Sequence, residues 1–309
     1  MRKVTHIFQR GAEGMVIFYT LHDYLVYYTI FSTYAKRMGL QVLGLAIMYN
    51  HLHILVVSGD KRLIRRFMTV ISSVFAREYN NDIGIDGDVF QRPYGASTKY
   101  GEKEIRTICG YLYNNHTNGK LCHKAEEIRW NFLAYAHNDH PFSEKIPLKK
   151  ARMAYRRAVK MVQAAHSRGD YLRYAALRRI FRGLTKNERE SITDYIVQVY
   201  NIIDYKALES LYSSYEEMVY SFNANVHHDY DIPESDEDRK GDFRAYQILS
   251  RLVTESKMVS GLKQILLLSE DERIMLALRC QAETGLPLKQ VSAFFHVKID
   301  FDRIKEGMI

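Results

Sequence analysis

The stretch Asn50–Ile54, with the sequence NHLHI, lies inside the largely apolar run Val42–Val57 and is the most informative feature of this chain. Alternate residues of a strand point to the same face, so His51 and His53 share a face, with their Cα atoms roughly 6.5–7 Å apart. At that spacing two imidazoles can bind one metal ion. Taken alone, a His-x-His pair in a half-buried strand is equally compatible with packing. The pattern therefore needs partners elsewhere in the chain.

A second set of polar groups lies on a predicted helix over Glu102–Asn115. Its core stripe follows i, i+3, i+4 and i+7 spacing, through Ile105, Ile108, Cys109 and Leu112. Tyr111 and Asn115 lie four residues apart on one edge of that stripe, so their side chains are neighbours. An amide oxygen is a hard ligand suited to Mg²⁺ or Mn²⁺, and imidazole widens the choice towards Mn²⁺ and later metals. A tyrosine hydroxyl beside such an ion can attack a phosphodiester as a covalent nucleophile.

Other interpretations of these residues stay open. The chain has 23 tyrosines, and Tyr113 is a rival nucleophile two positions further on. The helical arc favours Tyr111, because Tyr113 falls on the opposite flank from Asn115. Asn115 also has an alternative explanation, because an Asn near the end of a helix and shortly before a glycine, here Gly119, is a common signal for a helix C-terminus.

Four segments, taken in order, resemble the HUH single-strand nucleases and, among them, the Y1 (IS200-like) transposases. They are residues 48–56 (MYNHLHILV), 90–94 (FQRPY), 111–115 (YLYNN, followed by GKL at 119–121) and 129–135 (RWNFLAY). The REP-associated tyrosine transposases are the branch that they resemble most. The similarity covers about residues 1–145, and it depends on the order and spacing of the segments.

The resemblance implies an active site and a fold. It assigns a Mg²⁺ or Mn²⁺ ion to three side chains: His51, His53 and Asn115. It assigns the nucleophile to Tyr111. The implied fold is α+β, a ferredoxin-like antiparallel sheet with helices on one face, followed by an all-α extension. The chain departs from that branch at Tyr113, where His is common, and at His116, where Pro is common; both concern the shape of the helix end.

Residue patterns place the elements of this domain as follows. Strands are predicted at Val4–Gln9, Gly14–Tyr19, Gln41–Met48 and His51–Ser58, helices at His22–Gly39 and Arg62–Asn80, and an irregular strand or loop at Val89–Lys99. Strands interleaved with helices in this order favour a sheet whose histidine face lies against the Tyr111 helix.

The charge distribution indicates a polyanionic partner. The net charge is +8 and the pI about 9.2, so the surface attracts nucleic acid. Between Leu148 and Arg182 there are eleven Lys or Arg and a single acid, Asp170. A basic stripe on one helix face can follow a phosphate backbone; its members are Lys149, Arg152, Arg156 and Lys160. A solvated helix face is the alternative, and Arg92 is a further candidate DNA contact.

Length and composition suggest four regions: residues 1–145, the nuclease domain; 146–226, basic and helical; 227–242, an acidic linker; and 243–309, helical. In the last region we expect helices at Phe243–Leu268 and at Ser269–Thr284, the second opened by a capping box. Pro287–Phe295 and Ile299–Glu306 then resemble a helix-turn-helix, with a plain helical hairpin as the alternative.

Three cysteines without a Cys-x-x-Cys pair suit a reducing cytosol. The chain shows neither a signal peptide nor a membrane span, so we expect a cytoplasmic, nucleoid-associated protein. The expected function is metal-dependent cleavage and transfer of single-stranded DNA at a hairpin or palindromic repeat, through a 5′-phosphotyrosine. The sequence leaves open a homodimer and an alternative function, a domesticated protein that binds DNA or RNA hairpins without cleaving them.

Overall fold

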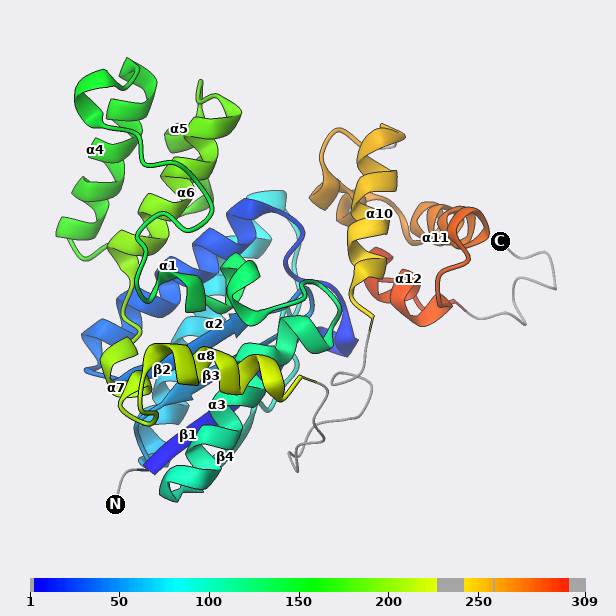
Figure 1. The fold of residues 1–309 in the computed structure, drawn as a ribbon. Coiled ribbons are helices and arrows are strands. Elements are labelled where there is room, and N and C mark those ends of the chain that lie inside the picture. Colours follow the sequence, from blue (N-terminus) through cyan, green and yellow to red (C-terminus); the bar gives the residue numbers. More distant parts are fainter. Residues whose placement is uncertain (1–2, 227–241, 258, 300–309) are drawn as a thin grey trace.

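A four-stranded antiparallel sheet with strand order β2-β3-β1-β4 forms the centre of the N-terminal half. The computed structural model describes residues 3–226, 242–257 and 259–299 (Figure 1). In chain order, the elements of the sheet domain are β1 (Lys3–Arg10), α1 (Leu21–Arg37), β2 (Val42–Ile47), β3 (His51–Val56), α2 (Lys61–Ile83) and β4 (Gly95–Tyr100). This βαββαβ order and strand arrangement are ferredoxin-like. The predicted fold class is confirmed.

Different helices cover the two faces of the sheet. Leu52, Ile54 and Val56 of β3 point into a core shared with α1 and α2. The helix α3 (Gly101–Asn118) packs on the other face, mainly against β2. Because side chains alternate along a strand, His51 and His53 point to the α3 face. The two crossover helices therefore lie together on one face, as expected, and α3 closes the histidine face.

Residues 15–19 do not form the strand predicted for Gly14–Tyr19. The amide groups of Ile17 and Phe18 both donate to the carbonyl of Tyr49, and the amide of Val16 donates to Ala293. The segment is extended, but its hydrogen bonds go to a loop and to a C-terminal helix instead of a neighbouring strand. The prediction was wrong because an alternating apolar pattern does not show which partner the backbone meets.

The segment after the sheet domain is helical, as predicted. Its helices are α4 (Met153–Ser167), α5 (Tyr174–Phe181), α6 (Lys186–Tyr200), α7 (Tyr205–Glu209) and α8 (Tyr215–Ala224). Residues of α4, α5 and α6 belong to the same buried core as α1 and α2. The carboxylate of Asp194, fully buried on α6, accepts hydrogen bonds from Arg129, Tyr135 and Ser143. These contacts attach the helical segment firmly to the sheet domain.

The basic stripe is not one continuous helix face. Lys149 lies in a separate short 3-10 turn, Leu148–Lys150, and Arg152 is the extended residue before α4. Only Arg156 and Lys160 lie on the helix itself. The prediction of four residues on one helix face was wrong because the chain becomes helical only at Met153.

The C-terminal helices form a third packed cluster. They are α10 (Arg244–Glu255), the 3-10 helix η6 (Leu262–Leu267), α11 (Glu270–Thr284) and α12 (Leu288–Phe295). The single helix predicted over Phe243–Leu268 is wrong: the chain turns after α10, where Lys257 has a φ of 53°. The capping box of Ser269 and Glu272 is present. The acidic linker, apart from Asp242, and the second helix of the predicted helix-turn-helix, apart from Ile299, lie outside the described residues.

A buried lysine joins the C-terminal cluster to the N-terminal half. The Lys263 ammonium, on η6, lies 3.0 Å from the Asp23 carboxylate and 3.4 Å from that of Asp82. The same ammonium lies over the rings of Tyr79 and Tyr174, 3.6 and 4.2 Å from their centroids. Carboxylates and aromatic faces together compensate for its desolvation.

The three cysteines, Cys109, Cys122 and Cys280, form no disulfide with one another. Among the residues described, no helix is both long and apolar enough to cross a bilayer.

Candidate metal and nucleophile site

The structure brings together the four residues predicted for the active site. His51 and His53 lie on β3, and Tyr111 and Asn115 lie on α3, which packs across that face of the sheet. All four side chains are buried, each no more than 5% exposed. The site thus forms where one strand and one helix meet.

One hydrogen-bond contact between these two elements joins a ring nitrogen to an amide oxygen. His51 Nε2 lies 3.2 Å from Asn115 Oδ1. Two atoms that occupy neighbouring positions around an octahedral ion at ~2.1 Å are about 3 Å apart. The pair therefore fits a Mg²⁺- or Mn²⁺-sized cation. Within the described residues no cluster of three or more His, Cys, Asp or Glu side chains has metal-binding geometry, so the amide is needed to complete a donor set.

The side-chain amide of Asn50 contacts the ring nitrogen of His51 that faces away from Asn115. Asn50 Oδ1 lies 2.8 Å from His51 Nδ1. The Asn50 Nδ2 group donates to the carbonyl of Gly14, which orients the amide with its oxygen towards the imidazole. A carbonyl-type oxygen only accepts, so His51 Nδ1 donates to Asn50 Oδ1, and the Nε2 lone pair of the neutral imidazole would point to an ion held between it and Asn115 Oδ1. This is the arrangement that metal-binding histidines use.

His53 and Tyr111 meet beside this pair. The Tyr111 ring lies edge-on to the His53 ring, with centroids 5.4 Å apart. A third imidazole, that of His6 on β1, lies 3.1 Å from His53 Nδ1 through its Nε2 and 5.7 Å from the Tyr111 ring centroid. The sequence reasoning missed His6. The residue lies in a strand that was predicted, but its approach to His53 depends on the pairing of that strand with β3, which no sequence pattern indicated.

The rival tyrosine has a different role. The Tyr113 hydroxyl donates to the carbonyl of Leu43, and its ring stacks on Phe222 with centroids 5.1 Å apart. Burial raises the pKa of Tyr113 well above its usual value. Tyr113 thus acts as a packing residue between α3, β2 and α8.

His116, the other departure from the family pattern, stays within α3. Its Nε2 group donates to the carbonyl of Ile47, and burial lowers the pKa of His116 to about 3. The neutral imidazole therefore helps to hold α3 against β2, and the helix continues to Asn118.

A residue from the C-terminal cluster covers the site. The ring of Phe243 lies 5.5 Å from the His51 ring, and its amide donates to the carbonyl of Gly119 at the end of α3. A Cβ on Gly119 would lie 2.6 Å from the Phe243 ring, so only glycine leaves space for this contact. No local pattern of the sequence indicated this partner.

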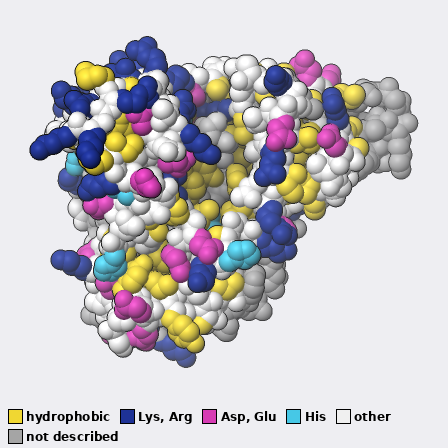
Figure 2. All heavy atoms as spheres, turned by 45° about the horizontal axis from the view of Figure 1, so that its top comes forward, with side chains coloured by type: hydrophobic (Ala, Val, Ile, Leu, Met, Phe, Trp, Pro, Cys, Tyr) yellow, Lys and Arg dark blue, Asp and Glu magenta, His cyan; other side chains and the backbone are white. Residues whose placement is uncertain are grey.

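The candidate DNA contacts lie outside the histidine–tyrosine site. Lys149, Arg152 and Lys160 are exposed, and Arg156 is partly so. Figure 2 shows Lys and Arg side chains gathered over α4 and α5. Arg152 pairs with Glu188 at 2.7 Å. Arg92 is highly exposed beside Asp88.

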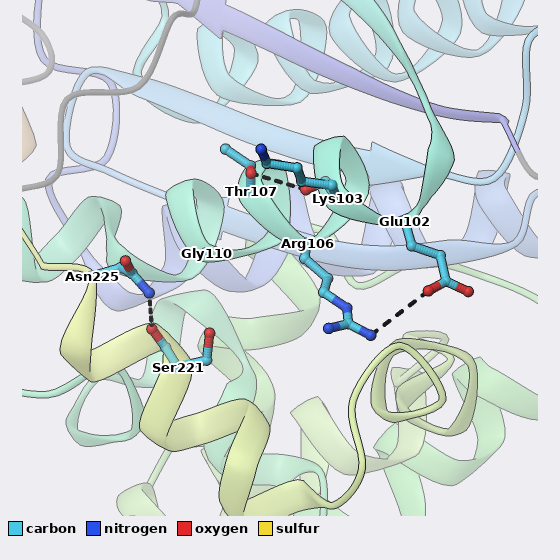
Figure 3. A pocket seen from close by; sticks show the side chains of 7 residues that line it. All are labelled: Glu102, Lys103, Arg106, Thr107, Gly110, Ser221 and Asn225. Carbon is cyan, nitrogen blue, oxygen red and sulfur yellow. Dashed lines mark hydrogen bonds and ion pairs between the residues drawn. The ribbon is translucent and has the colours of Figure 1, made fainter.

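A cleft of about 500 Å³ lies between α3 and α8, apart from this site (Figure 3). Its Arg106 guanidinium is already engaged: it lies 3.7 Å from the Glu102 carboxylate and over the Tyr212 ring. None of the four candidate site residues lines this cleft.

Comparison with known proteins agrees with the domain recognised in the sequence. Residues 17–115 match the family model described as "Transposase IS200 like", so this part of the chain is similar to IS200-like transposases. The matched segment contains the histidine pair, Tyr111 and Asn115. A solved structure of a REP-associated tyrosine transposase bound to a REP hairpin is similar at 9% identity, with a TM-score of 0.35, over 44% of this chain and 78% of that chain. No curated protein matches the chain.

Proposed function

We propose that this protein is a metal-dependent endonuclease and strand transferase for single-stranded DNA. One observation carries the proposal: the Tyr111 ring lies beside His53, while the neighbouring His51 presents a nitrogen 3.2 Å from the amide oxygen of Asn115. A protein that only binds DNA has no need for this set of groups buried side by side. The match of residues 17–115 to a transposase family supports the same conclusion.

The chemistry assigned to the chain is one phosphoryl transfer. The Tyr111 oxygen attacks the phosphorus of a phosphodiester, an O–P bond to the tyrosine forms, and the bond to the 3′ oxygen breaks. The phenolic proton leaves to solvent or a base, and the released strand end takes up a proton as a 3′-OH. Attack by another 3′-OH on the phosphotyrosine reverses the step and transfers the strand. A Mg²⁺ or Mn²⁺ ion held by His51, His53 and Asn115 supplies charge neutralisation at the phosphate when bound.

We assign the stem of a DNA hairpin or palindromic repeat to the basic surface of α4 and α5. A run of cations binds a phosphate backbone without reading its sequence. The candidate contacts are Lys149, Arg152, Arg156 and Lys160, and Arg92 is a further one from the loop before β4. The family match and the charge distribution support this assignment.

The test is formation of a covalent protein–DNA adduct. Wild-type protein, Tyr111→Phe and Tyr113→Phe are each incubated with hairpin-bearing single strands and Mn²⁺, and adducts are separated on denaturing gels. We expect adduct with wild type and Tyr113→Phe and none with Tyr111→Phe. Equal adduct with Tyr111→Phe would contradict the assigned nucleophile. Tight binding without any adduct would support the alternative, a non-cleaving hairpin-binding protein.

A further inference from the structure

The imidazole of His6 lies beside the candidate metal site but outside the four residues assigned to it. His6 is on β1, which is paired on both sides, with β3 and with β4. Its ladder partner on β3 is Leu55, so His53 is its diagonal neighbour on the same face of the sheet. Both histidines are fully buried. Strand pairing on both sides thus gives the His6 ring a fixed position next to His53.

The rings of His6 and His53 point at each other through one nitrogen each. His6 Nε2 lies 3.1 Å from His53 Nδ1, the ring centroids are 5.3 Å apart, and the ring planes differ by 11°. The centroid distance is close to the N–N distance plus the two ring radii, so the contact is nearly linear and in plane. Two ligands of one ion would instead be angled towards a common point. The geometry therefore indicates an N–H···N hydrogen bond, in which one nitrogen donates and the other accepts.

The direction of this hydrogen bond decides which nitrogen of His53 can bind a metal ion. A neutral imidazole has one N–H nitrogen and one nitrogen with a lone pair. If His53 Nδ1 donates to His6 Nε2, the lone pair of His53 lies on Nε2 and can bind a cation; in the reverse direction His53 Nε2 carries the proton. Metal-binding histidines generally donate their second N–H to a fixed acceptor. Asn50 Oδ1, 2.8 Å from His51 Nδ1, is such an acceptor for His51, and His6 Nε2 has the corresponding place beside His53.

His6 also contacts the candidate nucleophile. The Tyr111 ring lies 5.7 Å from the His6 ring and 5.4 Å from the His53 ring, and it is nearly perpendicular to both, at 84° and 87°. The two imidazoles thus form one flat surface against which Tyr111 packs. An apolar side chain at position 6 could pack there without the cost of burying a polar ring. What the imidazole adds is the acceptor nitrogen.

We propose that His6 is a positioning residue of the nuclease site. Its Nε2 accepts a hydrogen bond from His53 Nδ1, which holds His53 in the tautomer whose Nε2 binds the metal ion and fixes the ring beside Tyr111. His6 is not itself a ligand, because it acts through His53. The inference rests on the proposed nuclease function, since it gives His6 a role in the metal site assigned there.

The first test determines which nitrogen of His53 carries the proton. Long-range ¹H–¹⁵N NMR spectra of full-length, histidine-labelled protein without metal distinguish the two tautomers at about pH 8, where histidine is ordinarily neutral. The His53 signal is assigned by its absence in His53→Asn. We expect the Nδ1–H tautomer in wild type and loss of that preference in His6→Phe. The Nε2–H tautomer or a mixture in wild type would overturn the proposal, and so would an unchanged Nδ1–H tautomer in His6→Phe.

The second test measures the Mn²⁺ affinity of the full-length protein by isothermal titration, without DNA. His6→Phe keeps a ring but removes the acceptor, and should weaken Mn²⁺ binding by about 10- to 100-fold. His6→Gln has an oxygen acceptor at a similar reach to Nε2 and should recover most of the affinity. The control, His166→Phe, removes an imidazole that packs on Tyr200 at the end of α4, and should bind Mn²⁺ like wild type. Circular dichroism checks that each variant is folded.

Wild-type affinity in His6→Phe would overturn the proposal. Equal losses in His6→Phe and His6→Gln would also overturn it, because they would indicate a packing role alone. If wild type forms the Tyr111 adduct while His6→Phe binds Mn²⁺ normally, the role of His6 is wrong and the nuclease stands. The expected tautomer and affinities without any adduct would support the role of His6 and contradict the nuclease. Wild type that binds no Mn²⁺ would overturn both this inference and the metal site.

Discussion

His51 Nε2 and Asn115 Oδ1 lie 3.2 Å apart, although 64 positions separate the two residues in the chain. The Asn50 amide contacts the His51 ring, and Asn115 lies on a helix that packs against β2. Neighbouring protein groups therefore position both side chains.

Asn50→Ala should weaken Mn²⁺ binding by about 10- to 100-fold, because loss of the residue that orients a metal-binding histidine usually lowers the metal affinity by this factor. Isothermal titration with Mn²⁺ measures it without any cleavage assay. Asn80→Ala is the control, since that amide caps a surface turn through the carbonyl of Gly87. Unchanged affinity in Asn50→Ala would show that the His51 ring needs no such support.

Lys263→Ala should lower the free energy of unfolding by about 3 kcal/mol, because it leaves the fully buried Asp23 carboxylate without its cation. Urea denaturation followed by circular dichroism provides the measurement. Lys186→Ala, at an exposed position of α6, should change stability by less than about 0.5 kcal/mol. Similar values for both variants would mean that the aromatic and acidic cage contributes nothing.

Gly119→Ala should loosen the contact between α3 and the C-terminal helices. The new methyl group would lie 2.6 Å from the Phe243 ring, so that ring has to move, at a cost of about 1–3 kcal/mol. Faster hydrogen exchange at the start of α10 is the expected signal. Gly261→Ala is a matched control, because its Cβ would meet nothing within 4 Å. Protection of α10 that stays at the wild-type level would contradict the close packing.

His296 should make the C-terminal packing sensitive to acid. Burial lowers the pKa of His296 from 6.5 to about 4, and its Nε2 group donates to the carbonyl of Val16. The unfolded chain then binds more protons between these two pH values, so the stability is fully present above pH 6.5 and is lost as the pH falls towards 4. Thermal unfolding across this range should show a smaller decrease for His296→Gln than for wild type. Identical pH profiles would contradict the assignment.

Much of the sheet domain could be predicted because its signals are local. Alternation around His51 and His53 fixed one strand face, and i, i+4 spacing placed Tyr111 and Asn115 together. His6 and Phe243 were missed because their positions depend on strand register and on packing between distant segments. The prediction of one basic helix face was wrong at Lys149 because α4 begins only after Arg152, whose backbone is extended. The charge pattern does not show where the helix begins.

The most direct test of the central claim is to identify the tyrosine that becomes attached to DNA. Wild-type protein is incubated with a hairpin-bearing single strand and Mn²⁺, the DNA is digested to a short remnant, and the modified peptide is sequenced by tandem mass spectrometry. The account predicts the remnant on Tyr111. Attachment to any other of the 23 tyrosines would contradict it.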